Sequence, residues 1–171
     1  LRFNSLLCGR LHWGAFEGVN SMAIKVNYCS VEERDMDTLF LEAIGSDKGF
    51  LQLFTNEIEI LKEKTLEVNS IELSKSDSDG ESDITVIVEY ENKKYGLLIE
   101  DKINAIAMPD QCKRYTVRGK KGIKNGDYSD FFVFIVSPEK YHEQDEEAKK
   151  YKYYVSYEKC KKYLESKEDL L

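Results

Sequence analysis

The sequence predicts an α/β fold, an α/β/α sandwich in which helices cover a central mixed β-sheet. Residues 82–90 and 94–102 are rich in β-branched side chains and alternate apolar with polar positions, as the two strands of a β-hairpin do. Residues 131–136, FFVFIV, form a continuous apolar run, which is typical of a strand buried on both faces. Stretches with helical periodicity precede the hairpin and follow the last predicted strand.

A polar break at Glu91-Asn92 sets the register of the hairpin. A two-residue loop there puts Asp83 directly opposite Glu100, with Lys102 two residues further on the same face. A four-residue loop would keep this facing, whereas a three-residue loop would break it. We therefore expect two carboxylates and an ammonium group at one end of a hairpin with the following cross-strand pairs: Ile84 with Ile99, Val86 with Leu97, Val88 with Tyr95 and Glu89 with Lys94.

Two helices are expected before the hairpin. The segment Ser30-Val-Glu-Glu is a capping box that opens a helix over residues 31–45, and Gly45 ends it. Asp37 borders the apolar stripe of this helix, and Glu33 lies one turn upstream on the same side. A second helix is predicted over residues 47–66, followed by an edge or first strand over residues 68–75.

The helix after the hairpin is expected to start with Pro109 and Asp110 and to end at Gly119. Gln111 and Tyr115 lie one turn apart on it and share a face. The remaining elements are predicted as a basic loop over 120–130, the strand 131–136 closed by Pro138, a solvated helix or loop over 139–150, a strand over 151–157 and a short amphipathic helix over 158–167.

Composition restricts the possible functions. The chain has 171 residues, of which 42% are hydrophobic, and this suits one domain with a substantial core. Its net charge of −7 argues against a protein that coats nucleic acid or membranes through its overall charge. Residues 111–125 nevertheless contain no acidic side chain and six basic ones, which are candidates for nucleic-acid binding: Lys113, Arg114, Arg118, Lys120, Lys121 and Lys124.

Cysteine and histidine usage bears on compartment and chemistry. The four cysteines are widely scattered without a Cys-x-x-Cys pair, which favours reduced thiols and a cytoplasmic location over disulfides or a zinc site. His12 and His142 stand far apart and are poorly suited to a histidine metal site or a Ser-His-Asp triad. With no run of 18 apolar residues, no membrane partner is expected. Residues 1–21 are expected to be a leader or expression remnant outside a single domain over residues 22–171.

The order Asp83, apolar hairpin, Glu100-Asp101-Lys102 resembles the PD-(D/E)XK nuclease superfamily. Gln111 and Tyr115 in the following helix are similar to the Gln-x-x-x-Tyr element of its exonuclease-like branch. The resemblance covers roughly residues 30–165, and Ser82 stands where the superfamily's name implies proline. It implies a restriction-endonuclease-like fold and a metal-dependent nuclease that hydrolyses phosphodiester bonds, with DNA as the expected substrate, in defence, repair or recombination.

The resemblance also implies a metal site. Asp83 and Glu100 would bind Mg²⁺, for which Mn²⁺ can substitute, together with the main-chain carbonyl of Asp101. Hard divalent cations prefer such oxygen ligands. An acid from the first helix would complete the set, and Asp37 is preferred over Glu33 for this role.

Three further residues receive catalytic roles from the resemblance. Lys102 would orient the attacking water and stabilise the charge of the transition state. Gln111 and Tyr115 would position the nucleic-acid backbone or a water. The six basic side chains of residues 111–125 would hold phosphates, which suffices for salt-sensitive binding in an acidic chain.

Each of these residues also has an ordinary structural interpretation. Glu33 and Asp37 can serve as capping residues, and Gln111 and Tyr115 can be a solvated glutamine and a packing tyrosine. Two other classes of function stay open. One is a catalytically inactive nuclease-fold module that binds nucleic acid or a protein partner. The other is an acidic α/β interaction domain in which the Glu-Asp-Lys sequence is coincidental.

Overall fold

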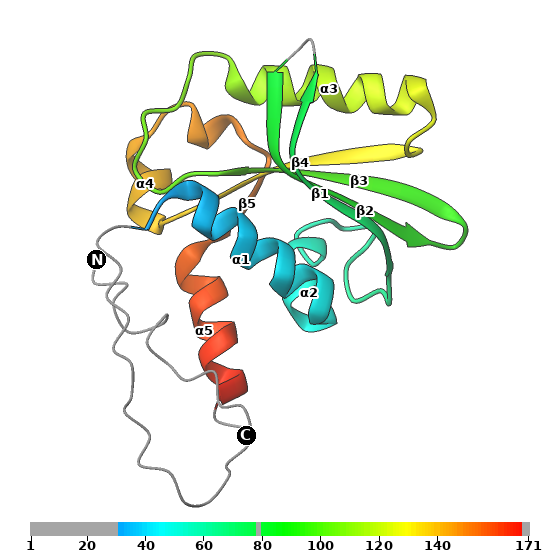
Figure 1. The fold of residues 1–171 in the computed structure, drawn as a ribbon, viewed down its shortest axis with the longest axis horizontal. Helices are drawn as coiled ribbons and strands as arrows, with labels where there is room; N and C mark the ends of the chain where they lie inside the picture. Colours follow the sequence, from blue (N-terminus) through cyan, green and yellow to red (C-terminus); the bar gives the residue numbers. More distant parts are fainter. Residues whose placement is uncertain (1–30, 78–79, 169–171) are drawn as a thin grey trace, which may run out of the picture. The chain divides into compact units, whose positions relative to one another are not determined.

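The predicted hairpin forms the centre of the fold in a computed structural model that describes residues 31–77 and 80–168 (Figure 1). The expectations for residues 1–21 and for Ser30 lie outside the described residues. The elements, in chain order, are α1 (Glu33–Ser46), α2 (Lys48–Thr55), β1 (Glu67–Asp77), β2 (Gly80–Tyr90), β3 (Lys93–Asp101), α3 (Gln111–Asn125), β4 (Asp130–Ser137), α4 (Glu139–Gln144), the 3₁₀ turn η1 (Ala148–Lys150), β5 (Tyr153–Ser156) and α5 (Tyr157–Glu168).

The five strands form one mixed sheet in the order β1-β2-β3-β4-β5. The first three strands are antiparallel, whereas β4 runs parallel to both β3 and β5. Strand β1 lies at an edge, as predicted, and β4 lies inside the sheet, as its apolar run predicts. Because β3, β4 and β5 are parallel, their carboxyl ends meet at one edge of the sheet.

The register of the β2–β3 hairpin is the predicted one. Its ladder runs from Tyr90 opposite Lys93 to Ile84 opposite Ile99. Glu91 and Asn92 form the two-residue turn with φ angles of 50° and 60°. Positive φ at both central residues is what a tight turn compatible with strand twist requires. The predicted pairing of Glu89 with Lys94 is also present.

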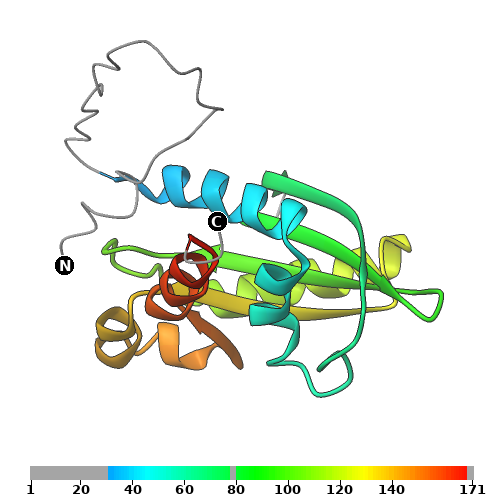
Figure 2. The ribbon, with the colours of Figure 1, turned by 90° about the horizontal axis from the view of Figure 1, so that it is seen from below.

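Helices flank both faces of the sheet (Figures 1 and 2). Helix α3 covers one face, while α1, α2 and α5 lie on the other. On the α3 side, the ring of Tyr128 packs on that of Phe131. On the other side, Phe54 packs edge-on against Phe134 and Phe40 packs against Tyr157. The protein is therefore an α/β protein with a mixed sheet between helices.

Two helix ends before the hairpin differ from the predictions. Helix α1 is capped by Glu32 and Asp35, since the Glu32 amide donates to the Asp35 carboxylate (2.9 Å), so the cap lies two residues after Ser30. Helix α2 ends at Thr55 rather than near residue 66. The chain continues in tight turns, and the side chain of Asn56 accepts a hydrogen bond from the amide of Glu63 (2.9 Å). A side-chain acceptor of this kind competes with helix continuation.

The predicted end of α3 at Gly119 is wrong, as is the predicted loop over its last six residues. The helix continues to Asn125, and Gly126, with φ of 81°, ends it. Gly119 has a packing role instead, because a Cβ there would lie 2.1 Å from the ring of Phe131. A Cβ on Gly122 would likewise lie 2.1 Å from the hydroxyl of Tyr128. These glycines let α3 lie close to the sheet.

Candidate functional site

The predicted site residues meet where the β2–β3 hairpin opens. Strand β2 contributes Asp83 near its start, and β3 contributes residues 100–102 at and just beyond its end. The start of α1, the start of α3 and helix α4 lie at the same end of the sheet (Figure 1). The side chains brought together are Glu33, Asp37, Asp83, Glu100, Lys102, Gln111 and Tyr115.

Beyond the last paired residues, Ile84 and Ile99, hydrogen bonds to side chains connect β2 with β3. The main-chain amide of Asp101 donates to Oδ2 of Asp83 (2.8 Å). The amide of Asp83 donates to the hydroxyl of Tyr115 (3.1 Å), and that hydroxyl donates to the carbonyl of Ile99 (3.3 Å). Tyr115 is fully buried, with 0% of its surface exposed. Its hydroxyl therefore connects the main chains of β2 and β3 and fixes their spacing where Asp83 faces the end of β3.

Glu100 lies at the centre of the cluster and is only 1% exposed. Its Oε1 lies 2.7 Å from the ammonium of Lys102 and also accepts a hydrogen bond from Nε2 of Gln111 (2.5 Å). Its Oε2 is buried and has no hydrogen-bond partner among the described residues. A buried carboxylate oxygen without a partner is costly unless a cation or a water satisfies it.

Lys102 links the hairpin to helix α1. Its ammonium donates to Oε2 of Glu33 (3.2 Å) and to the main-chain carbonyl of Asp101 (3.1 Å). The other oxygen of Glu33 accepts the amide of Ile103 (3.1 Å). Glu33 thus contacts both the side chain of Lys102 and the main chain that follows it.

Two further carboxylates are buried beside this group. Asp37 of α1 is buried, and its Oδ1 has no hydrogen-bond partner within the described ranges. The side chain of Asp101 accepts a hydrogen bond from the hydroxyl of Tyr157 on Oδ1, while its Oδ2 has no partner in the described part of the chain. Asp101 therefore meets the Lys102 ammonium through its main-chain carbonyl, while its carboxylate is bonded to Tyr157.

Burial and neighbouring acids raise the pKa values of two carboxyl groups at the site, those of Asp83 and Asp37. Burial, and next the charge of Glu100, raise the pKa of Asp83 to about 8. Burial, followed by the charges of Glu100 and Glu33, raises the pKa of Asp37 to about 6. Burial alone would lower the pKa of Lys102, but the surrounding carboxylates, Glu100 first, outweigh it and raise the pKa. When Asp83 and Asp37 are ionised, the site therefore holds more negative charge than the ammonium of Lys102 compensates.

The donor types at the site fit a hard divalent cation. Carboxylate and carbonyl oxygens are the ligands that Mg²⁺ prefers, and the partnerless oxygens of Glu100 and Asp37 are of this type. In the arrangement described, however, the ammonium of Lys102 contacts Glu100 directly. Among residues 31–77 and 80–168, no group of three acidic, histidine or cysteine side chains has the arrangement of a metal site.

The six basic residues of the 111–125 segment divide into three sets by exposure. Lys113, Lys120 and Lys124 are exposed on α3. Arg118 is buried, where its Nε donates to the hydroxyl of Ser82 (3.0 Å) and its guanidinium lies over the ring of Tyr115 (4.1 Å). Arg118 thus stabilises the start of β2 through a buried hydrogen bond to Ser82. Arg114 and Lys121 are half-buried, and a guanidinium nitrogen of Arg114 donates to the carbonyl of Pro109 (2.6 Å).

Sequence reasoning missed three residues that support the site. Ser82 accepts the hydrogen bond from Arg118, Tyr157 donates to Asp101, and the hydroxyl of Tyr141 donates to the carbonyl of Ala105 (2.9 Å). Tyr157 and Tyr141 are 56 and 36 residues away from their partners. No local pattern identifies such contacts, because they depend on how α4 and α5 pack at this end of the sheet.

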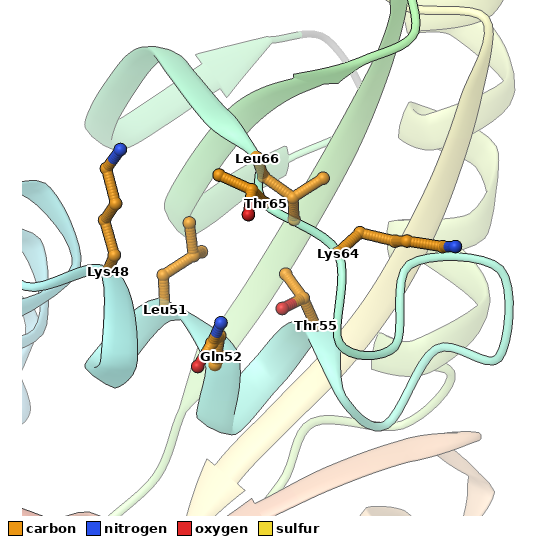
Figure 3. A pocket seen from close by; sticks show the side chains of 7 residues that line it. All are labelled: Lys48, Leu51, Gln52, Thr55, Lys64, Thr65 and Leu66. Carbon is orange, nitrogen blue, oxygen red and sulfur yellow. The ribbon is translucent and has the colours of Figure 1, made fainter.

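The site is separate from a small pocket beside α2 (Figure 3). This pocket has a volume of about 70 Å³, and its two lysines extend away from the other side chains. The hydroxyl of Thr55 in it is buried and has no hydrogen-bond partner in the described residues. The pocket is lined by Lys48, Leu51, Gln52, Thr55, Lys64, Thr65 and Leu66.

Comparisons of the chain with protein-family models, with curated proteins and with solved structures found no match. The described residues include no helix that is long and apolar enough to cross a membrane.

Proposed function

We propose that this protein is a Mg²⁺-dependent nuclease of the PD-(D/E)XK type, with a restriction-endonuclease-like fold, that hydrolyses phosphodiester bonds in DNA. The observation that carries the proposal is the clustering of half-buried Asp83 with the buried Glu100 and Lys102 at the open end of one hairpin. Ordinary structural roles leave such groups near the surface, because burying several carboxylates around one lysine is unfavourable. Functional sites are where such arrangements concentrate.

In the proposed site, Asp83 and Glu100 would hold the cation, and Asp37 and the carbonyl of Asp101 would supply further oxygen donors. When bound, Mg²⁺ supplies charge that offsets the phosphate and lowers the pKa of the attacking water. Lys102, whose ammonium is surrounded by acids, stays protonated and faces the charge that develops on the phosphate. Gln111 and Tyr115 hold Glu100 and Asp83 in position.

The other residues have supporting roles in this proposal. Glu33 holds Lys102 and the main chain after it. The exposed lysines of α3 bind phosphates away from the cut. Tyr157 binds the side chain of Asp101, which points to the face of the sheet opposite to Glu100. The main-chain carbonyl of Asp101 accepts a hydrogen bond from Lys102.

A cleavage assay tests the proposal. Plasmid, linear and single-stranded DNA are incubated with Mg²⁺, Mn²⁺ or EDTA and separated on a gel. We expect cleavage with either metal, none with EDTA, and a loss of at least about a hundredfold in Asp83→Asn and in Lys102→Ala. Lys94→Ala at the opposite end of the hairpin is the matched control, with unchanged activity. Wild-type protein that cleaves no substrate with either metal would remove the enzyme assignment.

A catalytically inactive nuclease-fold module is the second candidate. The direct contact of Lys102 with Glu100, and the lack of a three-ligand group in the described residues, favour it. Titration of Mn²⁺ followed by calorimetry separates the two. Binding that Asp83→Asn abolishes supports the nuclease, whereas nucleic-acid binding without metal binding or cleavage supports the module. An acidic interaction domain predicts neither metal binding nor nucleic-acid binding.

A further inference from the structure

Seven uncharged residues follow Lys102 in the loop that leads to helix α3. This apolar loop, residues 103–109, has the sequence INAIAMP in a chain of which 33% of the residues are charged. Ile106 is 89% exposed and Met108 is 61% exposed, the two highest values among the exposed large hydrophobic residues of the described chain. In the chain, both residues lie between Lys102 and Gln111, a few residues from each.

The candidate site holds the main chain of this loop in place. Glu33 accepts the amide of Ile103 (3.1 Å), and Oε1 of Gln111 accepts the amide of Met108 (3.2 Å). Between these points, the hydroxyl of Tyr141 donates to the carbonyl of Ala105 (2.9 Å). The loop is therefore tied to two side chains that themselves contact Lys102 and Glu100, and its apolar side chains are displayed from a fixed backbone.

We propose that the apolar loop packs against the bases of the nucleic acid next to the phosphate that is cut, with Ile106 and Met108 in contact with the base faces. This inference builds on the proposed nuclease function and deepens it. The loop connects Lys102 to α3 in the chain. A nucleic-acid strand that binds Lys102 with one phosphate and the exposed lysines of α3 with others would therefore pass the loop. Base faces are the large apolar surfaces of a nucleic acid, and isoleucine and methionine are among the side chains that proteins insert between bases.

This contact determines the class of substrate. The base faces of a duplex are covered by stacking, so the loop reaches them only where the bases are unstacked or the end is frayed. Single-stranded DNA and duplex ends are therefore the preferred substrates over internal positions of an intact duplex.

Binding measurements without cleavage test the inference. A fluorescein-labelled 20-mer single strand and an abasic 20-mer of the same length are titrated with full-length protein in Ca²⁺, and anisotropy is recorded at several salt concentrations. The variant is Ile106→Ser combined with Met108→Ser. The matched control is Ile60→Ser, another exposed isoleucine (52%), in the turns after α2.

We expect the double variant to bind the normal strand about tenfold more weakly than wild type. The slope of log affinity against log salt stays unchanged, because no phosphate contact is lost. On the abasic strand, wild type and double variant bind equally. Ile60→Ser binds both strands like wild type. In the cleavage assay, the double variant loses activity on single strands, with melting temperature unchanged.

Several results would overturn the inference. These are equal affinities of wild type and double variant for the normal strand, an equal loss on both strands, or no binding of either strand by wild type. A wild-type dimer that the double variant converts to monomers, seen by light scattering, would make the loop an interface between copies. If wild type cleaves DNA and the double variant binds the normal strand as wild type does, the proposed role of the loop is wrong and the proposed nuclease function stands. Base-dependent binding without any cleavage keeps the loop's role and removes the nuclease.

Discussion

The two ends of the β2–β3 hairpin carry the same kinds of side chain in opposite surroundings. At the turn, Glu89 faces Lys94, and Lys94 is exposed. At the open end, Glu100 and Lys102 form a 2.7 Å pair with 1% and 8% of their surfaces exposed. Water solvates the first pair, so its contribution to stability is about 0–1 kcal/mol. The second pair has lost that solvation, and its chemistry depends on the charges packed around it.

Replacing the lysine at each end gives the largest expected contrast. Lys102→Met leaves Glu100 and Glu33 without their ammonium partner, and we expect a loss of about 3–5 kcal/mol in the free energy of unfolding. Lys94→Met should cost about 0.5 kcal/mol or less. Urea denaturation at pH 8 in EDTA measures both. A Lys102→Met, Glu100→Gln double variant should recover part of the loss, and equal effects at the two ends would contradict the contrast.

The pH dependence of stability should come from the open end. The pKa values of about 8 for Asp83 and about 6 for Asp37 lie above the ordinary value of 3.8, so the folded state binds more protons than the unfolded state between these limits. Stability in EDTA is therefore full near pH 4 and falls, by on the order of a few kcal/mol, as the pH rises to 8. Melting temperatures across this range measure it.

The control for this pH dependence is Asp83→Asn, whose melting temperature should fall less between pH 4 and 8 because the titrating group is gone. Mg²⁺ at pH 8 should raise the melting temperature of wild type more than that of this variant, since a ligand that binds the folded state stabilises it. Identical pH profiles for the two proteins would show that Asp83 does not titrate as inferred.

Removing one hydroxyl at each end gives a smaller contrast. Tyr115→Phe leaves the amide of Asp83 without its acceptor, and we expect a loss of about 1–3 kcal/mol. Tyr95→Phe, near the turn of the same hairpin, should cost about 0.5 kcal/mol or less. The midpoint of urea unfolding reports both. If the open end were as solvated as the turn, the two substitutions would have similar effects.

The smallest effect is expected at the turn itself. Glu91 and Asn92 both have positive φ, where asparagine followed by glycine is favoured. Replacing this pair by Glu91→Asn and Asn92→Gly should stabilise the protein by about 0.5–1 kcal/mol. Thermal unfolding measures the gain, and cleavage activity should not change because the turn lies at the far end of the ladder. A change in activity would mean that the two ends are coupled.

The register of the hairpin, which depends on local chain geometry, was confirmed, whereas the predicted end of α3, which depends on packing, was wrong. The register follows from a two-residue turn and a period of two, both local properties. The end of α3 could not be predicted, because Gly119 indicates a helix end in the sequence but meets Phe131 in the fold. The burial of Arg118 could not be predicted either, because it also depends on packing. Arg118 is part of a basic run in the sequence, but it lies against Ser82 and Tyr115 in the structure.

The sequence by itself determined which residues share the open end of the hairpin, because alternation along two paired strands leaves one register that buries the apolar face. It did not determine the state of those residues. Only the tertiary structure decided that Glu100 is buried, that Lys102 contacts it and that Asp83 has a raised pKa. The physical reason is desolvation, which arises only when α1 and α3 close over the strand ends and exclude water from around their charges.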